Sequence, residues 1–366
     1  MTRSDFRSRI RNGILSVFFL PMLGAPDAYC TTEVHENAYR DPLNVPAVLS
    51  ARAMKTPLLD VTIAGKRLVA VGQQGRIVVS DDKGVTWRQV AVPVSTDLTA
   101  VTFATGQDGW AVGHDGVILH TKDGGLTWEK QLDGWQASRL IEDFYQAHAS
   151  DDESVQAAIK ESKGIASTAP SMSFLDVWFK NRQEGFVVGA FNLILKTNDG
   201  GVTWEPWYHR TDNPDYYHLS AITGIGDEVY IAGERGLVMK LDPAQQKFVA
   251  MSVPYKGSFF GVTMSRAVVV VYGLRGTAFV SHDHGASWQP SETGVQQALT
   301  GGVVTDKGEV VLTSLRGDLL RSDDQGATFS SVNTGRYRTL YGIVVTGESL
   351  VLTGQDGVQV DVVKPK

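Results

Sequence analysis

The sequence lacks the residues on which several classes of protein depend. It holds a single cysteine, which excludes an internal disulfide framework and any zinc site built from cysteines. Positive charge is not in excess, with Lys+Arg 34 against Asp+Glu 40 and a formal net charge of -6, which argues against a nucleic-acid-binding protein. Phosphate-binding glycine loops, serine-nucleophile elbows and zinc-binding helix motifs are absent, so we expect no catalytic residue, no metal and no cofactor.

A short apolar run lies near the amino terminus. Residues 14–25 (ILSVFFLPMLGA) follow four arginines and are too few to span a bilayer comfortably, which is typical of a signal peptide. We therefore assign residues 1–30 to a signal peptide, 31–44 to a linker and 45–366 to the folded domain. This interpretation predicts export to the periplasmic or lumenal side. We expect no lipid anchor at Cys30, because the three residues before it (DAY) do not form a lipobox.

One phrase, S/T-x-D-x-G-x-T/S-W, recurs five times and is known as the Asp box. Its aspartates are Asp82, Asp123, Asp199, Asp283 and Asp324, and four copies end in Trp87, Trp128, Trp204 and Trp288. The carboxylate can accept hydrogen bonds from N–H groups of its own turn, and the glycine allows positive φ. One key carboxylate per copy is too few for calcium, which takes six to eight oxygens. The pattern therefore favours a structural role.

Short β-rich runs surround each Asp box, three before it and one after. The second run of each unit ends at positions 72, 113, 189, 233, 273, 314 and 354, and all intervals but one are 40–44 residues. That period is typical of a four-stranded propeller blade. The sequence therefore predicts an all-β, seven-bladed β-propeller with Asp-box turns and a short helical insertion between blades 2 and 3.

Two units depart from this pattern. The fourth, around residues 241–244, has lost the Asp-box glycine. The seventh ends after its third run, near residue 363. We expect residues 45–53 (VPAVLSARA) to supply its outer strand, because an exposed sheet edge invites aggregation.

The one long interval contains the insertion, residues 135–171, which reads as a helical hairpin. Its first segment, residues 138–148, carries an apolar side that includes Ile141 and Tyr145, and its second is capped by Ser150 or Asp151. Neither segment is long enough to form a stable helix alone, so the apolar side of the hairpin must pack against another surface. We expect it to dock on the propeller; binding of a partner is the alternative.

A propeller places the turns between second and third strands on the same face as the blade-to-blade loops, opposite the Asp boxes. Three successive units have an arginine at the same spot in that turn, Arg235, Arg275 and Arg316, with Arg76 near the other end of the arc. Guanidinium groups suit carboxylates and phosphates, so we predict a binding surface here. The alternative is that each pairs with a neighbouring acid such as Glu234 or Asp318. Residues 209–212 and 216–218 form a polar, aromatic loop on this face and are expected to shape that surface.

The stretch Gly113–Trp128 (G-x-x-G-x-I/L-x-x-T/S-x-D-G-G-x-T-W) resembles the photosystem II stability and assembly factor family. The resemblance covers roughly residues 45–363. It implies an exported propeller that binds a membrane protein or membrane-complex assembly intermediate through a basic face, without catalysis; we also expect a monomer and no nucleic acid. The helical insertion and the missing lipobox depart from the cyanobacterial pattern, which leaves open a scaffold for another membrane complex.

The competing hypothesis is a sialidase-like or glucanase-like glycoside hydrolase, because Asp boxes also occur in those enzymes. The Arg-Ile-Pro segment of sialidases is absent, and two-propeller glucanases need a longer chain. Glycoside hydrolysis requires two facing carboxylates. Asp60 and Asp176 stand at matching positions of inner strands and are the candidates for that pair.

Overall fold

The computed structural model describes residues 40–333, 337–347 and 349–362. The predicted signal peptide, most of the linker and Cys30 lie outside these residues. The described residues belong to one contact-dense unit that begins at Arg40.

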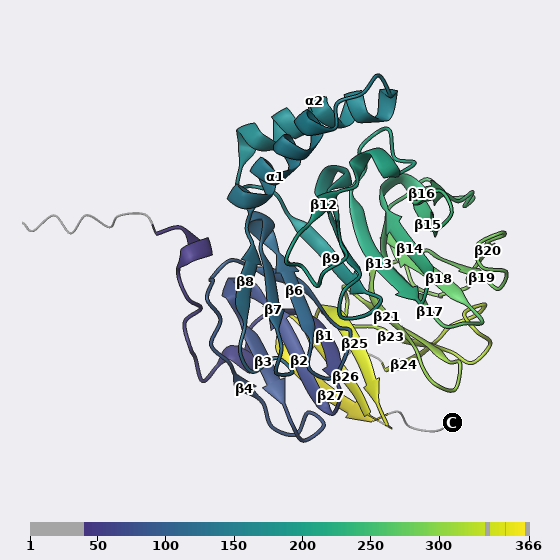
Figure 1. Ribbon diagram of the computed structural model, residues 1–366. Helices are drawn as coiled ribbons and strands as arrows, with labels where there is room; N and C mark the ends of the chain where they lie inside the picture. The colour runs from purple at the N-terminus through teal and green to yellow at the C-terminus, as the bar shows by residue number, and fades with distance from the viewer. Residues whose placement is uncertain (1–39, 334–336, 348, 363–366) are drawn as a thin grey trace, which may run out of the picture. The chain divides into compact units, whose positions relative to one another are not determined.

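Seven antiparallel sheets make up this unit, six with four strands and one with three (Figure 1). Each sheet runs in chain order from an inner to an outer strand. The inner strands are β1 (Leu58–Ala64), β5 (Leu98–Phe103), β9 (Phe174–Phe179), β13 (Leu219–Ile225), β17 (Phe259–Met264), β21 (Leu299–Val304) and β25 (Leu340–Thr346). The second strands are β2 (Arg67–Gly72), β6 (Gly109–Gly113), β10 (Gly185–Gly189), β14 (Glu228–Gly233), β18 (Val269–Gly273), β22 (Val310–Ser314) and β26 (Ser349–Gly354).

The third strands are β3 (Ile77–Ser80), β7 (Ile118–Thr121), β11 (Ile194–Thr197), β15 (Val238–Asp242), β19 (Ala278–Ser281), β23 (Leu319–Ser322) and β27 (Gly357–Val362). The outer strands are β4 (Arg88–Gln89), β8 (Glu129–Leu132), β12 (Glu205–Pro206), β16 (Lys247–Ala250), β20 (Gln289–Pro290) and β24 (Ser330–Asn333). Each inner strand contacts the next one along the chain, and β25 contacts β1, which closes the ring. The seven-bladed propeller is confirmed, with all seven second strands ending where the spacing predicts.

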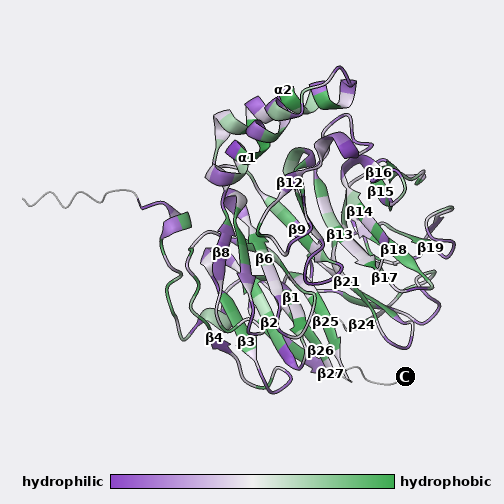
Figure 2. Cartoon of the chain, in the orientation of Figure 1, coloured by the Kyte–Doolittle hydropathy of each residue, from purple (hydrophilic) through white to green (hydrophobic). Residues whose placement is uncertain are grey.

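The hydrophobic core lies between neighbouring blades. Seven clusters of buried residues are present, and each joins side chains from two adjacent sheets. Ala70 of the first blade, for example, packs in one cluster with Val351 of the seventh. Figure 2 shows apolar residues along the strands and hydrophilic ones in many connecting turns. Closure of the ring therefore buries apolar surface at every blade boundary.

The last sheet has only the strands β25, β26 and β27 among the described residues. The prediction that residues 45–53 form its fourth strand is wrong, because that segment contains no strand. It runs instead along the outer edge of blade 1, where the Ala47 N–H donates to the Val92 carbonyl at 3.0 Å. The short helix that follows, Ala53–Lys55, contacts β27. Residues 40–57, which we call the strap, thus connect the first and last blades without pairing as a strand.

The insertion folds into the predicted hairpin of helices, α1 (Gly134–Ala147) and α2 (Glu153–Thr168). Both begin at residues other than those expected from the apolar stripe. Asp133 and Gln136 form a capping box that starts α1 four residues before position 138, and Asp152 caps α2 in place of Ser150 or Asp151. Figure 1 shows the hairpin beside β12 of blade 3.

The five Asp boxes share one hydrogen-bonding pattern. In the second blade the Thr127 N–H and hydroxyl donate to the two oxygens of Asp123 at 3.0 and 2.6 Å, and the Thr121 hydroxyl donates to the same carboxylate at 2.8 Å. Equivalent bonds are made by Asp82, Asp199, Asp283 and Asp324. Hydrogen bonds to a carboxylate favour its charged form, and those from Thr86 and Ser80 lower the pKa of Asp82 to about 2.

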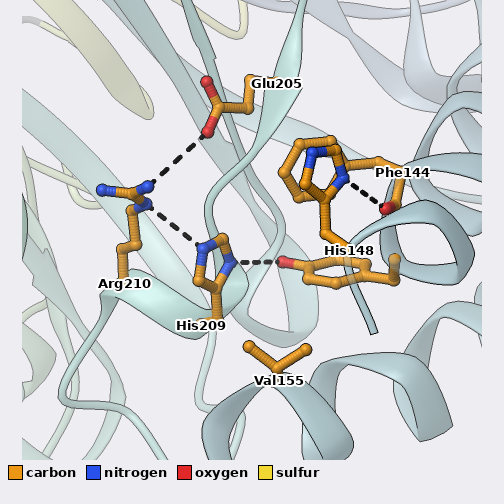
Figure 3. A pocket seen from close by; sticks show the side chains of 7 residues that line it. Phe144, His148, Val155, Glu205, His209 and Arg210 are labelled. Atoms are coloured by element: carbon orange, nitrogen blue, oxygen red, sulfur yellow. Dashed lines mark hydrogen bonds and ion pairs between the residues drawn. The ribbon is translucent and has the colours of Figure 1, made fainter. Parts of the chain in front are cut away.

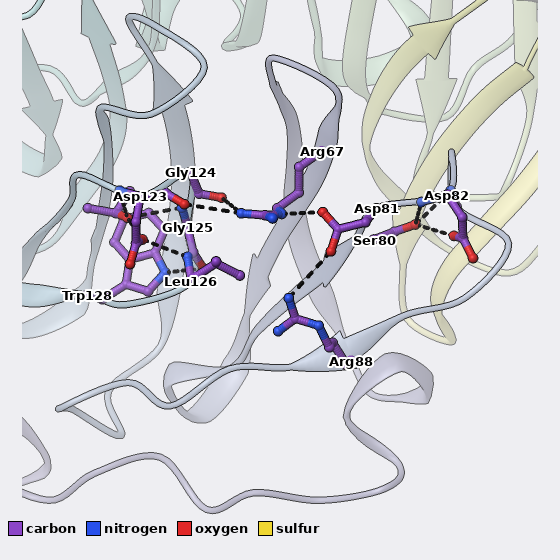
Figure 4. Close-up of polar contacts among 12 residues, drawn as sticks. Arg67, Ser80, Asp81, Asp82, Arg88, Asp123, Gly124, Gly125, Leu126 and Trp128 are labelled. Atoms are coloured by element: carbon purple, nitrogen blue, oxygen red, sulfur yellow. Dashed lines mark hydrogen bonds and ion pairs between the residues drawn. The ribbon is translucent and has the colours of Figure 1, made fainter.

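The Asp-box turns also connect successive blades. The carbonyl after the aspartate accepts a bond from the preceding blade in three places: Gly124 from Arg67 at 2.9 Å, Gly200 from Trp110 at 3.2 Å, and His284 from Lys240 at 3.0 Å. Figure 4 shows Arg67 between the turn of blade 2 and Asp81 of its own blade. The Asp-box turns therefore also stabilise the contact between neighbouring blades.

Candidate functional site

The face opposite the Asp boxes is formed by two sets of connections that touch one another. A Cβ on Gly236, in the turn between β14 and β15, would lie 2.0 Å from the Tyr255 carbonyl oxygen in the next blade-to-blade loop. Gly276 approaches the Val295 carbonyl in the same way. The second-to-third-strand turns and the blade-to-blade loops therefore lie on one face.

Most of these turns share an unusual backbone conformation. In five blades the middle residue of the turn has φ between 53° and 59°, in the left-handed region that favours glycine. These residues are Gln74, Asp115, Phe191, Arg235 and Arg275. In the sixth blade Gly317, and not Arg316, has the positive φ. Arg316 therefore shares the turn but not the conformation of the other two arginines.

The arginines on three successive blades, Arg235, Arg275 and Arg316, are all exposed on this face, and we call them the arginine arc. Within the part of the chain that the structure describes, none of the three guanidinium groups has an ion pair. Arg235 lies over the ring of Tyr217, with its Cζ atom 5.9 Å from the ring centroid.

The acids expected to pair with the arc bond elsewhere. Glu234 accepts the His218 N–H at 2.9 Å, and Asp318 accepts the Ser314 hydroxyl at 2.6 Å. Arg76 follows its turn rather than standing at the tip, and its guanidinium donates to the Gln73 carbonyl and the Gln74 side chain at 3.2 and 2.7 Å. The arc thus consists of three unpaired arginines, and Arg76 folds back on its own turn.

Two cavities open on this face beside the arc. The first, of about 530 Å³, is lined by Phe191, Tyr217, Arg235 and Lys256 together with neighbouring loop residues. The second, of about 500 Å³, lies between α2 and blade 3 and has mostly apolar walls that include Ile165, Met172, Leu193 and again Phe191. Because both cavities share Phe191, they are adjacent.

The helical hairpin docks on the propeller, as expected. Ile141 and Tyr145 of α1 are buried in the same cluster as Trp110 and Val187 of the second and third blades. A third cavity, of about 310 Å³, remains between the hairpin and blade 3, lined by residues that include His148, Glu205 and Arg210. Figure 3 shows it from close by.

His209 connects α1 to the blade inside this cavity. Its Nε2 atom accepts a hydrogen bond from Arg210 Nε at 3.2 Å, so the ring is neutral and the proton lies on Nδ1, 3.0 Å from the Tyr145 hydroxyl. Burial, and then the charge of Arg210, lower the pKa of His209 to about 4. The cavity is therefore built around a histidine that stays neutral at ordinary pH.

Asp60 and Asp176, the candidates for a hydrolytic pair, bridge neighbouring inner strands. Each accepts the N–H of the residue after it and an N–H of the next blade, from Val101 to Asp60 at 2.9 Å and from Ile222 to Asp176 at 2.8 Å. Burial raises the pKa of Asp60 to about 6 and that of Asp176 to about 7. Both oxygens of each carboxylate are already engaged by the backbone.

Sequence reasoning missed Phe191 and Lys256. The available signal for Phe191 is its place in the repeat, because phenylalanine stands where the equivalent turns of other blades have Arg, Asp or Gln. Lys256 carried no such signal, because it lies in a blade-to-blade loop outside the repeated pattern.

Neither a membrane span nor a metal centre was found in the described ranges. None of their helices is both long and apolar enough to cross a bilayer. The same residues contain no group of three or more His, Cys, Asp or Glu side chains placed to hold a metal ion.

Comparison with known proteins places the chain near one family. The family model described as "Photosynthesis system II assembly factor YCF48" matches residues 48–146 and 164–334. The photosystem II assembly lipoprotein Ycf48 of Synechococcus sp. (strain CC9902) is 28% identical over 132 residues, which span 34% of this chain and 38% of that protein. The photosystem II stability/assembly factor HCF136 of Cyanidioschyzon merolae is 32% identical over 91 residues, 23% of this chain and 21% of that protein.

The fold is shared more widely than the sequence. A solved structure named "YCF48 bound to D1 peptide" superposes with a TM-score of 0.62 at 17% identity, covering 89% of this chain and 99% of its own. YCF48 from Cyanidioschyzon merolae gives the same TM-score at 16% identity, covering 84% and 96%. At these identities the likeness shows the propeller fold alone.

Proposed function

This chain belongs to the family of the photosystem II assembly factor YCF48, and from that premise we propose that it is an exported, non-catalytic scaffold. In this proposal the face opposite the Asp boxes binds a membrane protein or an assembly intermediate of a membrane complex. The arginine arc contributes the contact, and the ligand groups it takes are carboxylates.

The observation that carries the proposal is the arc itself. Three exposed guanidinium groups stand at the same turn of three successive blades, while the nearby acids are bonded elsewhere. Unpaired guanidinium groups are well suited to bidentate bonds with carboxylates. One solved relative of the same fold carries the name "YCF48 bound to D1 peptide", which supports a polypeptide as the ligand. Arg76 is left out of the contact, because its guanidinium folds back onto the Gln73 carbonyl and the Gln74 side chain.

The absence of catalysis is part of the proposal. The family match supports a scaffold rather than a glycoside hydrolase. A hydrolytic acid or nucleophile needs a carboxylate oxygen that is free to meet the substrate. The oxygens of Asp60 and Asp176 instead accept backbone N–H groups of two neighbouring blades.

Export to the periplasmic or lumenal side is proposed from the charged and apolar leader. The names of several relatives include the word lipoprotein. Our expectation of no anchor at Cys30 stays a prediction, since Cys30 lies outside the described residues.

The test is charge reversal of the arc. A membrane protein that crosslinks to the wild-type chain in native membranes is first identified and purified. We expect the variant R235E/R275E/R316E to bind this protein with at least tenfold lower affinity than the wild type. The matched control is K122E/R266E/K307E, which makes the same change in net charge at three exposed residues outside the arc. Undiminished binding by the arc variant would contradict the proposal.

A further inference from the structure

We propose that the partner binds as an extended peptide whose apolar side chain enters the cavity between α2 and blade 3 while a neighbouring carboxylate contacts Arg235 and Lys256. Phe191 is the wall that the two cavities share. This inference rests on the proposed function and deepens it, since it names the kind of segment recognised and the sector of the face that recognises it.

Phe191 occupies a position that is unfavourable for a structural phenylalanine. Its backbone has φ 53° and ψ 48°, in the left-handed region, and its side chain is 61% exposed. Left-handed backbone disfavours a bulky side chain, and exposure of the ring forgoes the stabilisation that burial would give. Strain of this kind is concentrated at binding and active sites.

The position of the Phe191 ring is nevertheless defined. The ring packs against His218 with centroids 4.5 Å apart, and the Phe191 N–H donates to His218 Nδ1 at 3.0 Å. An exposed aromatic ring between two cavities is typical of a binding anchor, since aromatic and arginine residues dominate interface energetics.

The cavity under α2 fits an apolar side chain. Its walls come from Ile165 on the helix and from Met172 and Leu193 on blade 3, and most of its surface is apolar. The family match skips residues 147–163, which include the first part of α2. The first part of the helix that closes this cavity therefore lies outside the matched residues, whereas Ile165, Met172 and Leu193 lie within them.

The adjoining cavity favours an acidic group. Glu234 already accepts the His218 N–H at 2.9 Å, and interaction with the Asp215 carboxylate raises the pKa of Tyr217. Arg235 and Lys256 are both exposed, and neither has an ion pair among the residues that the structure describes. Glu234 is therefore engaged within the protein while Arg235 and Lys256 have no ion pair among the described residues, so the complementary ligand is a carboxylate.

An extended peptide satisfies both cavities with one short segment. Successive residues of an extended chain advance by about 3.3 Å, so an apolar and an acidic side chain a few residues apart can reach adjacent hollows. A second copy of this chain would have to form a self-complementary, symmetric interface through this face. A peptide segment of another protein has no such requirement.

The probes are fluorescein-labelled peptides of twelve residues with a glycine and serine background. One series carries a Leu and a Glu at separations of one to six residues; two others carry only the Leu or only the Glu. We expect fluorescence anisotropy to show that the doubly substituted peptide of the preferred separation binds at least tenfold more tightly than either single one.

The diagnostic variant is Phe191→Gly. Glycine adopts positive φ readily, so we expect the thermal midpoint to stay the same or rise, while the doubly substituted peptide binds only as well as the Glu-only peptide. The matched control is Gln74→Gly, which makes the same change at the equivalent left-handed position of the first blade and should leave peptide binding unchanged. For R235A/K256A we expect the opposite result: the doubly substituted peptide should bind only as well as the Leu-only peptide.

The outcomes separate this inference from the proposed function. If Phe191→Gly binds the doubly substituted peptide as the wild type does, the inference is overturned, whereas charge reversal of the arc still decides the scaffold proposal. If the arc variant keeps its membrane partner, the scaffold proposal fails, and the inference fails with it. Self-association that sedimentation velocity detects and Phe191→Gly abolishes would identify a second copy as the occupant and would overturn the peptide assignment.

Discussion

At the scale of single residues, neutral and charged states are fixed by hydrogen bonds between elements. His209 is the clearest case, because Arg210 donates to one ring nitrogen and the Tyr145 hydroxyl contacts the other. A protonated ring could no longer accept the bond from Arg210. Protonation would therefore break the bond from Arg210, whereas the Nδ1–H could still donate to the Tyr145 hydroxyl of α1. Burial and the charge of Arg210 lower the pKa of His209 and so keep the ring neutral.

The pH dependence of stability should report this state. The pKa of His209 is about 4 in the folded chain and about 6.5 in the unfolded chain. The contribution of neutral His209 to the free energy of unfolding is therefore complete above pH 6.5 and is lost as the pH falls toward 4. We expect His209→Gln to remove part of this dependence, on the order of 1–2 kcal/mol after discounting for partial exposure. Urea denaturation of both proteins at pH 7.5 and 4.5 measures it.

Two other residues act in the opposite direction over the same range. The pKa values of Asp60 and Asp176 are raised above that of an unfolded aspartate, so their contribution to stability increases as the pH falls through 7 and 6. They are present in both proteins, and the comparison between wild type and His209→Gln cancels them. Parallel pH curves for the two proteins would refute the role of His209.

At the scale of elements, the sequence predicts that the insertion forms two helices but does not predict the residues at which they begin. The apolar stripe with Ile141 and Tyr145 indicates a helix because its spacing places both on one face. The start of α1 at Gly134 depends on the capping box of Asp133 and Gln136, whose side chains satisfy free backbone groups of the first turn. The docking surface could not be predicted, because blade 3 and η6 (Tyr208–Arg210) are brought to the hairpin by tertiary folding.

Truncating the centre of that interface should destabilise the hairpin. Ile141 is fully buried, so we expect Ile141→Ala to lower the free energy of unfolding by about 2–4 kcal/mol through lost burial and a cavity. The control is Arg139→Ala, an exposed position on the same helix, with an expected effect within about 0.5 kcal/mol. Limited proteolysis between α1 and α2 should increase for Ile141→Ala alone; equal effects of the two changes would contradict the docking.

At the scale of the whole molecule, the ring closes although the last blade has three strands among the described residues. Inner strands β25 and β1 contact each other, and the strap runs from blade 1 to β27. Leu43, Ala47 and Ala53 of the strap are buried, and Lys130 Nζ of the second blade donates to the Leu43 carbonyl at 2.9 Å. The strap thus joins three blades by side-chain burial and isolated hydrogen bonds.

Removal of most of the strap should therefore lower stability even though it is not a strand. For a chain that begins at residue 56 we expect the thermal midpoint to fall by roughly 5–10 °C, because burial of these three side chains is worth a few kcal/mol. The control V48S/L49S changes strap residues that are 76% and 63% exposed and should leave the midpoint nearly unchanged. Differential scanning calorimetry decides the outcome, and an unaltered midpoint in the shortened chain would refute this role.

The sequence by itself determined the features that repeat. Blade number, the ends of the second strands, the Asp-box turns and the alignment of Arg235, Arg275 and Arg316 follow from short-range patterns, since a turn and its hydrogen bonds lie within about eight residues. Only the tertiary structure decided that the acids near the arc bond elsewhere, that Phe191 separates two adjacent cavities, and that residues 45–53 add no strand to the last blade. These features depend on loops from different blades, whose approach is set by ring closure and not by local sequence.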